Sequence, residues 1–489
     1  MVTTRPSRSE EIRNRVGHPI IDADGHTLEL TPVLSDYVYD QGGADARDRF
    51  ERMMKGAPEA GSGESSAGKT WFAMTPEERK ENWHPATPWW FAPTTNVLDR
   101  ATATVPRVLN QRMDELGMDY AVLYTTLGLG FDRIEGQEQR FIVCRAMNAC
   151  AADLYREYSH RMTPAAIVPM DTPEIAIREM EYAVNDLGLK TIMLPGRVNR
   201  PIPRHLEEHP EAEAVTRYID VIGIDSQYDY DPLWARCQEM GITPASHGSD
   251  FFWGAVSTSK YMFNHLSAFA HGHDTFAKAL FLGGVTKRFP GLNFIFLEGG
   301  VAWACNLYSD LIGHWEKRNG KMIGRLDPRH LDQEMILDLV REYGEEIMQL
   351  KIDEIREMYA TPDPHPAELD DWSHVPMDSI EEMLDLFVEP FYFGCEADDP
   401  MNAWAFNSKV NPLGARLKAV FSSDIGHWDV PDMREVVEEA YELVEHELIS
   451  EEDFRDFMFA NTVNLYGKVN PRFFDGTAVE TEARELLGR

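Results

Sequence analysis

Short apolar runs alternate with amphipathic segments along most of the chain. Eight of these runs have the length and composition of buried strands, and the segments between them repeat hydrophobic residues at helical spacing. Strands that alternate with helices predict parallel β–α units rather than an all-helical or all-β fold. The predicted strands cover residues 19–24, 119–126, 164–170, 189–196, 241–248, 292–300, 389–397 and 417–424.

Eight β–α units are the number that closes a barrel. Glycines mark two of the predicted helix ends, because Gly117 and Gly188 stand where C-caps belong. We therefore predict an α/β fold, a distorted (β/α)8 TIM barrel over residues 19–475, with an N-terminal extension at 1–18 and a C-terminal tail at 476–489. Three segments exceed a minimal barrel and are predicted insertions that shape the pocket or an oligomer contact: 41–92, 197–230 and 316–388.

Composition and charge narrow the class of protein. The 489 residues carry a formal net charge of −35, which disfavours binding to a phosphate backbone. No run of about 18 apolar residues and no apolar N-terminal core is present, so we expect neither a membrane span nor a membrane partner. The cysteines show no metal-binding or disulfide spacing, which predicts buried thiols and a cytoplasmic location. They are Cys144, Cys150, Cys237, Cys305 and Cys395.

Four side chains that can bind a metal stand at the ends of predicted strands. Asp24 and His26 end the first, His247 the fifth and Asp424 the eighth. Because a parallel barrel brings the carboxyl ends of its strands to one mouth, these four can meet in space. Two imidazoles and two carboxylates suit one divalent ion of the Zn, Mn or Fe type. Taken singly, each also has a structural interpretation, as a turn residue, a buried histidine or a helix cap.

Glu298 and His427 are further candidates for catalysis. Glu298 ends the sixth predicted strand, and His427 follows Asp424 by three residues. With Asp424 they could act as acids, bases or substrate-orienting groups beside a metal. Three histidines before the sixth strand could form a second metal site, although capping and surface roles are favoured for them. They are His265, His271 and His273.

Residues 63–70, GESSAGKT, match the phosphate-loop string but lack the strand before it and the helix after it. We interpret them as a flexible loop and expect no nucleotide cofactor. Two aromatic runs could line an apolar pocket, with ordinary core packing as the alternative. They are Trp89–Trp90–Phe91 and Phe251–Phe252–Trp253.

Six segments in order make the chain similar to the amidohydrolase superfamily: IIDADGH, RMDELGMDYAVLY, PLWARCQEMGITPASHG, ALFLGGVTKRFPGLNFIFLEGGVAW, FSSDIGH and FMFANTVNLYG. They resemble its amidohydrolase-related branch, which includes metal-dependent decarboxylases similar to aminocarboxymuconate semialdehyde decarboxylase. The resemblance spans residues 19–467 and implies metal ligands at Asp24, His26, His247 and Asp424. Members often carry a histidine where this chain has Glu298. No lysine stands at 194–196 to bridge two metals, so a single ion is expected.

The favoured function is a metal-dependent hydrolase that attacks a small aromatic or cyclic substrate with a metal-activated water. Asp424 would take the proton from that water, and Glu298 and His427 would orient the substrate. The alternative is non-oxidative decarboxylation of an aromatic or unsaturated carboxylate. A non-catalytic barrel that binds a ligand is a third possibility, which the presence of all four metal-ligand types disfavours. A homo-oligomer, specifically a homodimer, is expected from the family and the insertions.

Overall fold

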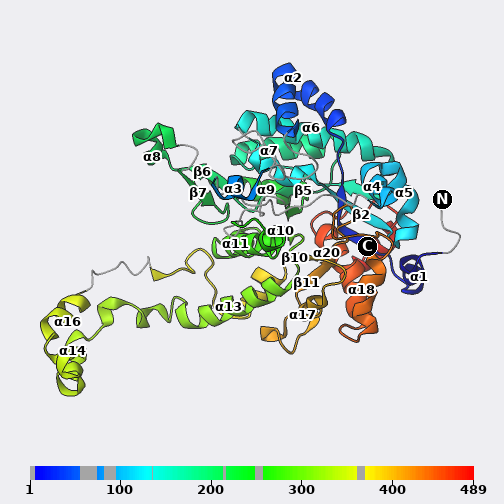
Figure 1. Cartoon of the computed structure of the whole chain (residues 1–489). Helices are drawn as coiled ribbons and strands as arrows, with labels where there is room; N and C mark the ends of the chain where they lie inside the picture. The colour runs from blue at the N-terminus through cyan, green and yellow to red at the C-terminus, as the bar shows by residue number, and fades with distance from the viewer. Residues whose placement is uncertain are drawn as a thin grey trace.

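The predicted strands are all present in the computed structural model (Figure 1). The structure describes residues 6–55, 74–81, 95–134, 136–212, 216–247, 257–360 and 369–489. The third predicted strand is divided at Ala165 into two short pieces. The barrel strands are β1 (Ile21–Thr27), β2 (Tyr120–Thr125), β3 (Met162–Pro164) with β4 (Ala166–Ile167), β5 (Ile192–Leu194), β8 (Pro244–Ser246), β9 (Phe294–Phe296), β10 (Phe391–Cys395) and β11 (Lys418–Phe421).

These strands form a closed ring. One parallel sheet has the order β1–β2–β3 and the other the order β11–β10–β9–β8–β5–β4, so the divided third strand joins them on one side. On the other side the end of β11 meets β1, because Asp424 N donates to Asp24 O at 3.0 Å and His26 N donates to Ile425 O at 2.9 Å. The ring confirms the predicted distorted (β/α)8 barrel.

Successive residues of each strand serve two different cores. On β2, Val122 and Tyr124 join one buried cluster, whereas Ala121 and Leu123 join the other. The same alternation holds on β9, where Ile295 belongs to the first cluster and its two neighbours belong to the second. Side chains of a strand point alternately to its two faces, so one cluster includes the barrel interior and the other fills the layer between strands and helices.

Helix α5 ends at the glycine that the sequence marks as its C-cap, whereas α7 ends at Glu181, before the predicted end at Gly188. Gly117 (φ +78°) closes α5 in the left-handed conformation, which costs little without a Cβ. No described helix combines the length and apolar character that a bilayer span requires. The helices nearest the barrel are α4 (Val97–Thr104), α5 (Pro106–Leu116), α6 (Gln137–Tyr155), α7 (Pro173–Glu181), α9 (Asp231–Met240), α10 (Tyr261–His265), α11 (Ala268–Leu282), α12 (Val285–Arg288), α13 (Ala302–Arg318), α17 (Ala403–Phe406), α18 (Val436–Glu445), α19 (Glu451–Arg455) and α20 (Asn461–Gly467).

The remaining elements lie in the terminal segments and the predicted insertions. The insertion at 197–230 contains an antiparallel hairpin, and the one at 316–388 carries helices far from the barrel (Figure 1). The GESSAGKT segment and both aromatic runs lie outside the described residues. These further elements are α1 (Arg8–Arg15), α2 (Thr31–Lys55), α3 (Pro76–Glu81), β6 (Val198–Pro201), α8 (Pro203–Glu208), β7 (Arg217–Asp220), α14 (Gln333–Tyr343), α15 (Glu346–Gln349), α16 (Ile352–Tyr359) and α21 (Glu480–Leu486).

Trp234 on α9 tests how far the barrel depends on its outer core. Its side chain is fully buried and meets Phe294 of β9 edge-on, with ring centroids 5.5 Å apart. We expect Trp234→Ala to lower the free energy of unfolding by about 3–5 kcal/mol, because it leaves a large cavity. Urea unfolding followed by tryptophan fluorescence and circular dichroism measures the loss. Trp404→Ala, at a site 46% exposed, is the control and should change stability by less than about 0.5 kcal/mol.

Candidate metal centre and active site

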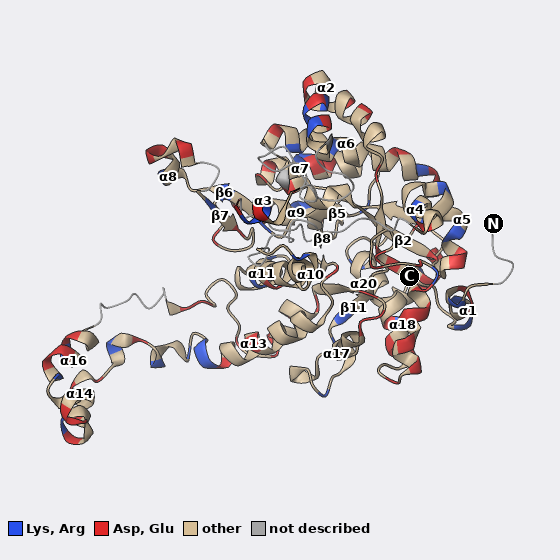
Figure 2. Ribbon diagram, in the orientation of Figure 1, with Lys and Arg blue, Asp and Glu red and all other residues tan. Residues whose placement is uncertain are grey.

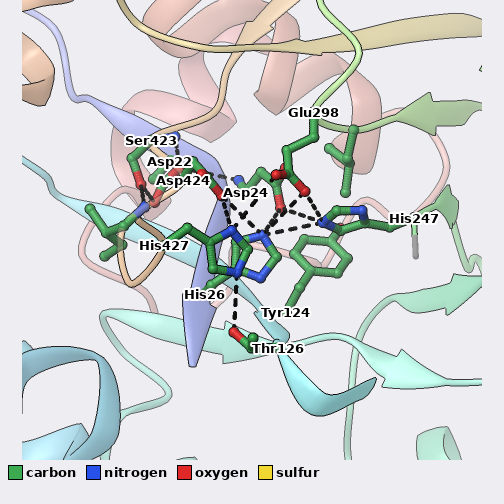
Figure 3. Close-up of polar contacts among 12 residues, drawn as sticks. Asp22, Asp24, His26, Tyr124, Thr126, His247, Glu298, Ser423, Asp424 and His427 are labelled. Atoms are coloured by element: carbon green, nitrogen blue, oxygen red, sulfur yellow. Dashed lines mark hydrogen bonds and ion pairs between the residues drawn. The ribbon is translucent and has the colours of Figure 1, made fainter. Parts of the chain in front are cut away.

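Six ionisable side chains converge at the mouth of the barrel (Figure 3). They come from the ends of four strands that are far apart in the sequence, and all six are buried. The four metal ligands predicted from the sequence are therefore brought together, and the two predicted catalytic residues lie beside them. The six are Asp24 and His26 on β1, His247 after β8, Glu298 after β9, and Asp424 and His427 after β11.

A β-bulge in β1 directs Asp24 and His26 toward the centre. The pairing with β2 shifts between Asp22 and Gly25, so β1 holds one residue more than its partner there. Such a bulge bends a strand and re-aims its side chains. Gly25 leaves the room that this bend needs, because a Cβ at that position would lie 2.7 Å from Asp22 Oδ2.

The distances among the six side chains suit coordination of one small cation. His26 Nε2 lies 3.4 Å from an oxygen of Asp24 and 3.4 Å from an oxygen of Asp424. His247 Nε2 lies 3.2 Å from His26 Nε2 and 3.5 Å from Asp24 Oδ1. Two overlapping ligand groups result, both containing His26, and the ligand atoms of each group lie within 4.8 Å of one another. Mixed imidazole and carboxylate ligation suits Zn, Mn or Fe.

Five carboxylate oxygens of the site accept no hydrogen bond with good geometry from the described residues. Both oxygens of Asp24, both of Asp424 and Oε2 of Glu298 are buried without such a donor among the described residues. A buried carboxylate normally accepts several hydrogen bonds, because its desolvation costs several kcal/mol otherwise. A bound divalent cation satisfies these oxygens at once, so the residues present fit the ion that the sequence predicts.

Two of the carboxylates sit on strained backbone. Glu298 and Asp424 have φ of +60° and +51°, in the left-handed region that side chains with a Cβ rarely adopt. Strain of this kind costs on the order of 1–3 kcal/mol and collects at functional sites. Both side chains point toward the histidines at the barrel mouth (Figure 3).

Burial governs the protonation of the site. It raises the pKa values of Glu298 and Asp424 well above their usual range, with further increases from neighbouring carboxylates. It lowers the pKa of His427 to about 3 and that of His26 well below its ordinary value. Burial also acts to lower the pKa of His247, but Asp24 and Glu298 outweigh it and the pKa is raised.

Asp22 is a positioning residue that the sequence did not single out. Ser423 donates to it twice, from its amide at 2.9 Å and its hydroxyl at 2.6 Å, and the amide of Asp24 donates at 3.1 Å. These bonds join the ends of β1 and β11, which hold three of the proposed ligands. Burial raises the pKa of Asp22 to about 7 despite these donors. The only signal in the sequence is an acidic residue two positions before Asp24.

His427 is held between two strand ends. Its Nδ1 lies 2.5 Å from Asp424 Oδ1, and its Nε2 lies 3.1 Å from the hydroxyl of Thr126, which follows β2. Its ring stacks on that of His26, with centroids 3.7 Å apart. These contacts fix the imidazole beside Asp424. A group held in this way can orient a base or pass on a proton.

The three histidines considered for a second metal site do not form one among the described residues. His265 packs against Trp428, with ring centroids 5.7 Å apart. His273 differs from the predicted surface or capping role, because it is fully buried. Its Nε2–H donates to Leu297 O at 2.5 Å, and its Nδ1 lies 3.2 Å from the hydroxyl of Ser246. It therefore ties together the residues that precede Glu298 and His247.

A cavity of about 770 Å³ opens on the same side of the barrel as the six side chains. Its walls are formed by residues that follow β2, β4 and β5 and by the β6–β7 hairpin. Its lining holds three arginines and three acidic residues, and Arg140 pairs with Asp171. The charged residues are Arg140, Arg197, Arg217, Asp132, Asp171 and Glu211.

Several solved structures are similar to this chain at low sequence identity. An amidohydrolase of Mycobacterium avium subsp. paratuberculosis K-10 aligns with a TM-score of 0.53 and 17% identity, over 92% of this chain and 98% of that one. A 2,6-dihydroxybenzoate decarboxylase from Rhizobium aligns with a TM-score of 0.48 and 12% identity, over 92% of this chain and 98% of that one. A dihydroxybenzoic acid decarboxylase from Polaromonas sp. JS666 aligns with a TM-score of 0.49 and 16% identity, over 92% of this chain and 97% of that one. That structure contains bound manganese and the inhibitor 2-nitroresorcinol.

The protein family is identified by a family model, because structural similarity at such low sequence identity shows only the fold. The model described as amidohydrolase matches residues 71–345, which is more than half of the chain. The matched region includes His247 and Glu298, and the ring of strands around it has the architecture expected from the motifs. The chain belongs to the amidohydrolase family.

Proposed function

We propose that the protein is a metal-dependent decarboxylase of a small aromatic or unsaturated carboxylate. The observation that carries this proposal is the number of carboxyl groups in one buried site: Asp24, Glu298 and Asp424. One divalent cation balances the charge of two carboxylates, so the third keeps its proton at neutral pH. Departure of CO2 leaves an electron pair on carbon, and a buried acid beside that carbon can protonate it.

We assign Asp24, His26, His247 and Asp424 to hold the ion and Glu298 to hold the proton. When bound, a divalent ion supplies positive charge that stabilises negative charge on substrate oxygens. Glu298 suits the acid role because burial, the largest cause, raises its pKa well above its usual range, and the neighbouring Asp24 raises it further. Its Oε1 lies 3.7 Å from His427 Nδ1, which gives it a route for regaining a proton.

The reaction balances without a further reagent. The bond between the substrate carbon and its carboxyl carbon breaks, CO2 leaves, and Glu298 transfers its proton to the carbon that keeps the electron pair. Water then restores the proton to Glu298 by way of His427.

Hydrolysis is the second candidate, and the pair of Asp424 and His427 favours it. Asp424 Oδ1 lies 2.5 Å from His427 Nδ1, an arrangement in which an imidazole orients a carboxylate base. In this alternative Asp424 takes a proton from water and returns it to the leaving group. Glu298 and His427 then orient the substrate carbonyl.

Isotopes distinguish the two reactions. With hydroxybenzoates as substrates in D2O, we expect release of CO2 and one deuterium on the carbon that lost the carboxyl group. With aryl esters and amides in ¹⁸O-labelled water, we expect no label in the acid product. Mass spectrometry of the products measures both. If the acid product contained ¹⁸O and no CO2 were released, the protein would be a hydrolase and the decarboxylase proposal would be wrong.

Metal content tests the ligand assignment independently of turnover. We expect wild-type protein to hold one divalent ion per chain and His247→Ala or Asp24→Ala to lose most of it, because each removes a donor atom from a buried site. Elemental analysis by plasma mass spectrometry gives the stoichiometry. His314→Ala is the matched control, since this exposed residue lies on α13 and bonds only locally to Asp310 O. Equal metal content in all four proteins would contradict the assignment.

Glu298→Gln separates proton donation from metal binding. The amide keeps the shape of the side chain but carries no acidic proton, so we expect turnover to fall by about 100-fold or more. Metal content should stay at the wild-type level, whereas Asp424→Asn should lose both metal and turnover. Steady-state kinetics and elemental analysis of the same samples check this. Loss of metal in Glu298→Gln would make Glu298 a ligand instead of the acid.

A further inference from the structure

We propose that the helical arm beyond α13 is a dimerisation element that pairs with the arm of a second copy of this chain. We define the arm tip as residues 331–360, which contain α14, α15 and α16. These helices lie at the far end of α13, well away from the barrel (Figure 1). Their apolar side chains therefore have no barrel surface to cover them.

The arm tip holds much of the exposed apolar surface of the described chain. Of the 24 exposed large hydrophobic side chains among the described residues, eight lie in these 30 residues, at 39–74% exposure. Single exposed apolar residues are ordinary on a protein surface, but a concentration of this size marks an interaction site. The eight are Leu331, Met335, Leu339, Tyr343, Ile347, Met348, Leu350 and Met358.

On α14 these residues form a stripe. Met335, Leu339 and Tyr343 are four positions apart and are 60%, 46% and 73% exposed, so they lie along one helix face. Leu337 points elsewhere and is the one described residue of α14 that is fully buried, while α15 and α16 contain no buried residue. Short helices gain most of their stability from packing of an apolar face. The arm tip has almost no core of its own, which implies that another surface covers the stripe.

The charge of the arm tip excludes several other occupants. It carries nine Asp and Glu residues against three Lys and Arg, a net charge of −6, and Figure 2 shows the acidic residues over α14 and α16. All three basic residues already pair within the tip: Arg341 with Asp338, Lys351 with Glu354 and Arg356 with Glu334. An anionic membrane or a nucleic acid would be repelled.

A second copy fits the area and the geometry. Large side chains at these fractions expose on the order of 100 Å² each. The tip therefore offers on the order of 800 Å², which one partner buries in a standard interface. Two helical hairpins that meet about a two-fold axis form a four-helix bundle with the stripes inside. The acidic residues then lie at the rim, so the contact should strengthen as salt screens their repulsion.

The molar mass of the full-length protein, measured by sedimentation and light scattering, tests whether the chain dimerises. We expect wild-type protein at about twice the 55.8 kDa of the chain, with a dimer fraction that rises between low and moderate salt. Leu339→Glu combined with Tyr343→Glu should give the monomer. Leu448→Glu is the control, at a body site of matched 45% exposure, and should leave the dimer intact. A wild-type monomer, a dimer unaffected by the arm variants, or association that weakens with salt would overturn the proposal.

A conservative variant guards against misfolding of the glutamate forms. The five native cysteines are all free and buried, so Leu339→Cys introduces one accessible thiol per chain. Mild oxidation should link two chains of Leu339→Cys in a band that reduction removes, whereas Leu448→Cys should stay monomeric on the gel. Binding of wild-type protein to neutral lipid vesicles with no crosslink at residue 339 would identify a lipid surface instead and would also overturn the proposal.

Discussion

Burial of three carboxyl groups beside three imidazoles is the constraint around which the barrel mouth is organised. The six groups come from the ends of four strands, and all of them are buried. Uncompensated charges of this kind would cost several kcal/mol each. The molecule lowers this cost by raising the pKa values of Glu298 and Asp424, and a divalent cation would remove most of what remains. In the proposed function, the same crowding keeps the proton on Glu298, which makes acid catalysis available.

Closure of the barrel and assembly of the site depend on the same contacts. The last strand meets the first through backbone bonds at Asp24, His26 and Asp424 themselves, and Asp22 adds two bonds from Ser423. His273 performs a similar role on the opposite side by bridging Ser246 and Leu297. The proposed ligands therefore do not lie on independent loops. Their geometry is fixed where the ring of strands is most constrained, as preorganised sites require.

The sequence predicts the ring and the polar side chains at its mouth because both follow from local rules. Buried strands are apolar runs, and the carboxyl ends of parallel strands share one edge, so Asp24, His26, His247 and Asp424 can be grouped from their positions alone. The bulge in β1, the left-handed backbone at Glu298 and Asp424 and the reach of His273 cannot be predicted in this way. Each results from contacts between distant segments, and neither propensity nor spacing encodes such contacts. The arm is a similar case. Its amphipathic helices can be predicted from the sequence, but their distance from the barrel cannot.

Strain and charge at the mouth link catalysis to stability. Without a cation, the protein holds poorly satisfied carboxylates on left-handed backbone, and both features oppose folding. A cation that binds only the folded chain would stabilise the folded state and offset these costs. The stabilisation would be larger for a cation that binds more tightly. In the absence of an ion, the outer core around Trp234 and Phe294 would have to stabilise the fold. The barrel can therefore keep its mouth strained and reactive because its stability comes from the layer between strands and helices, away from the groups that do the chemistry.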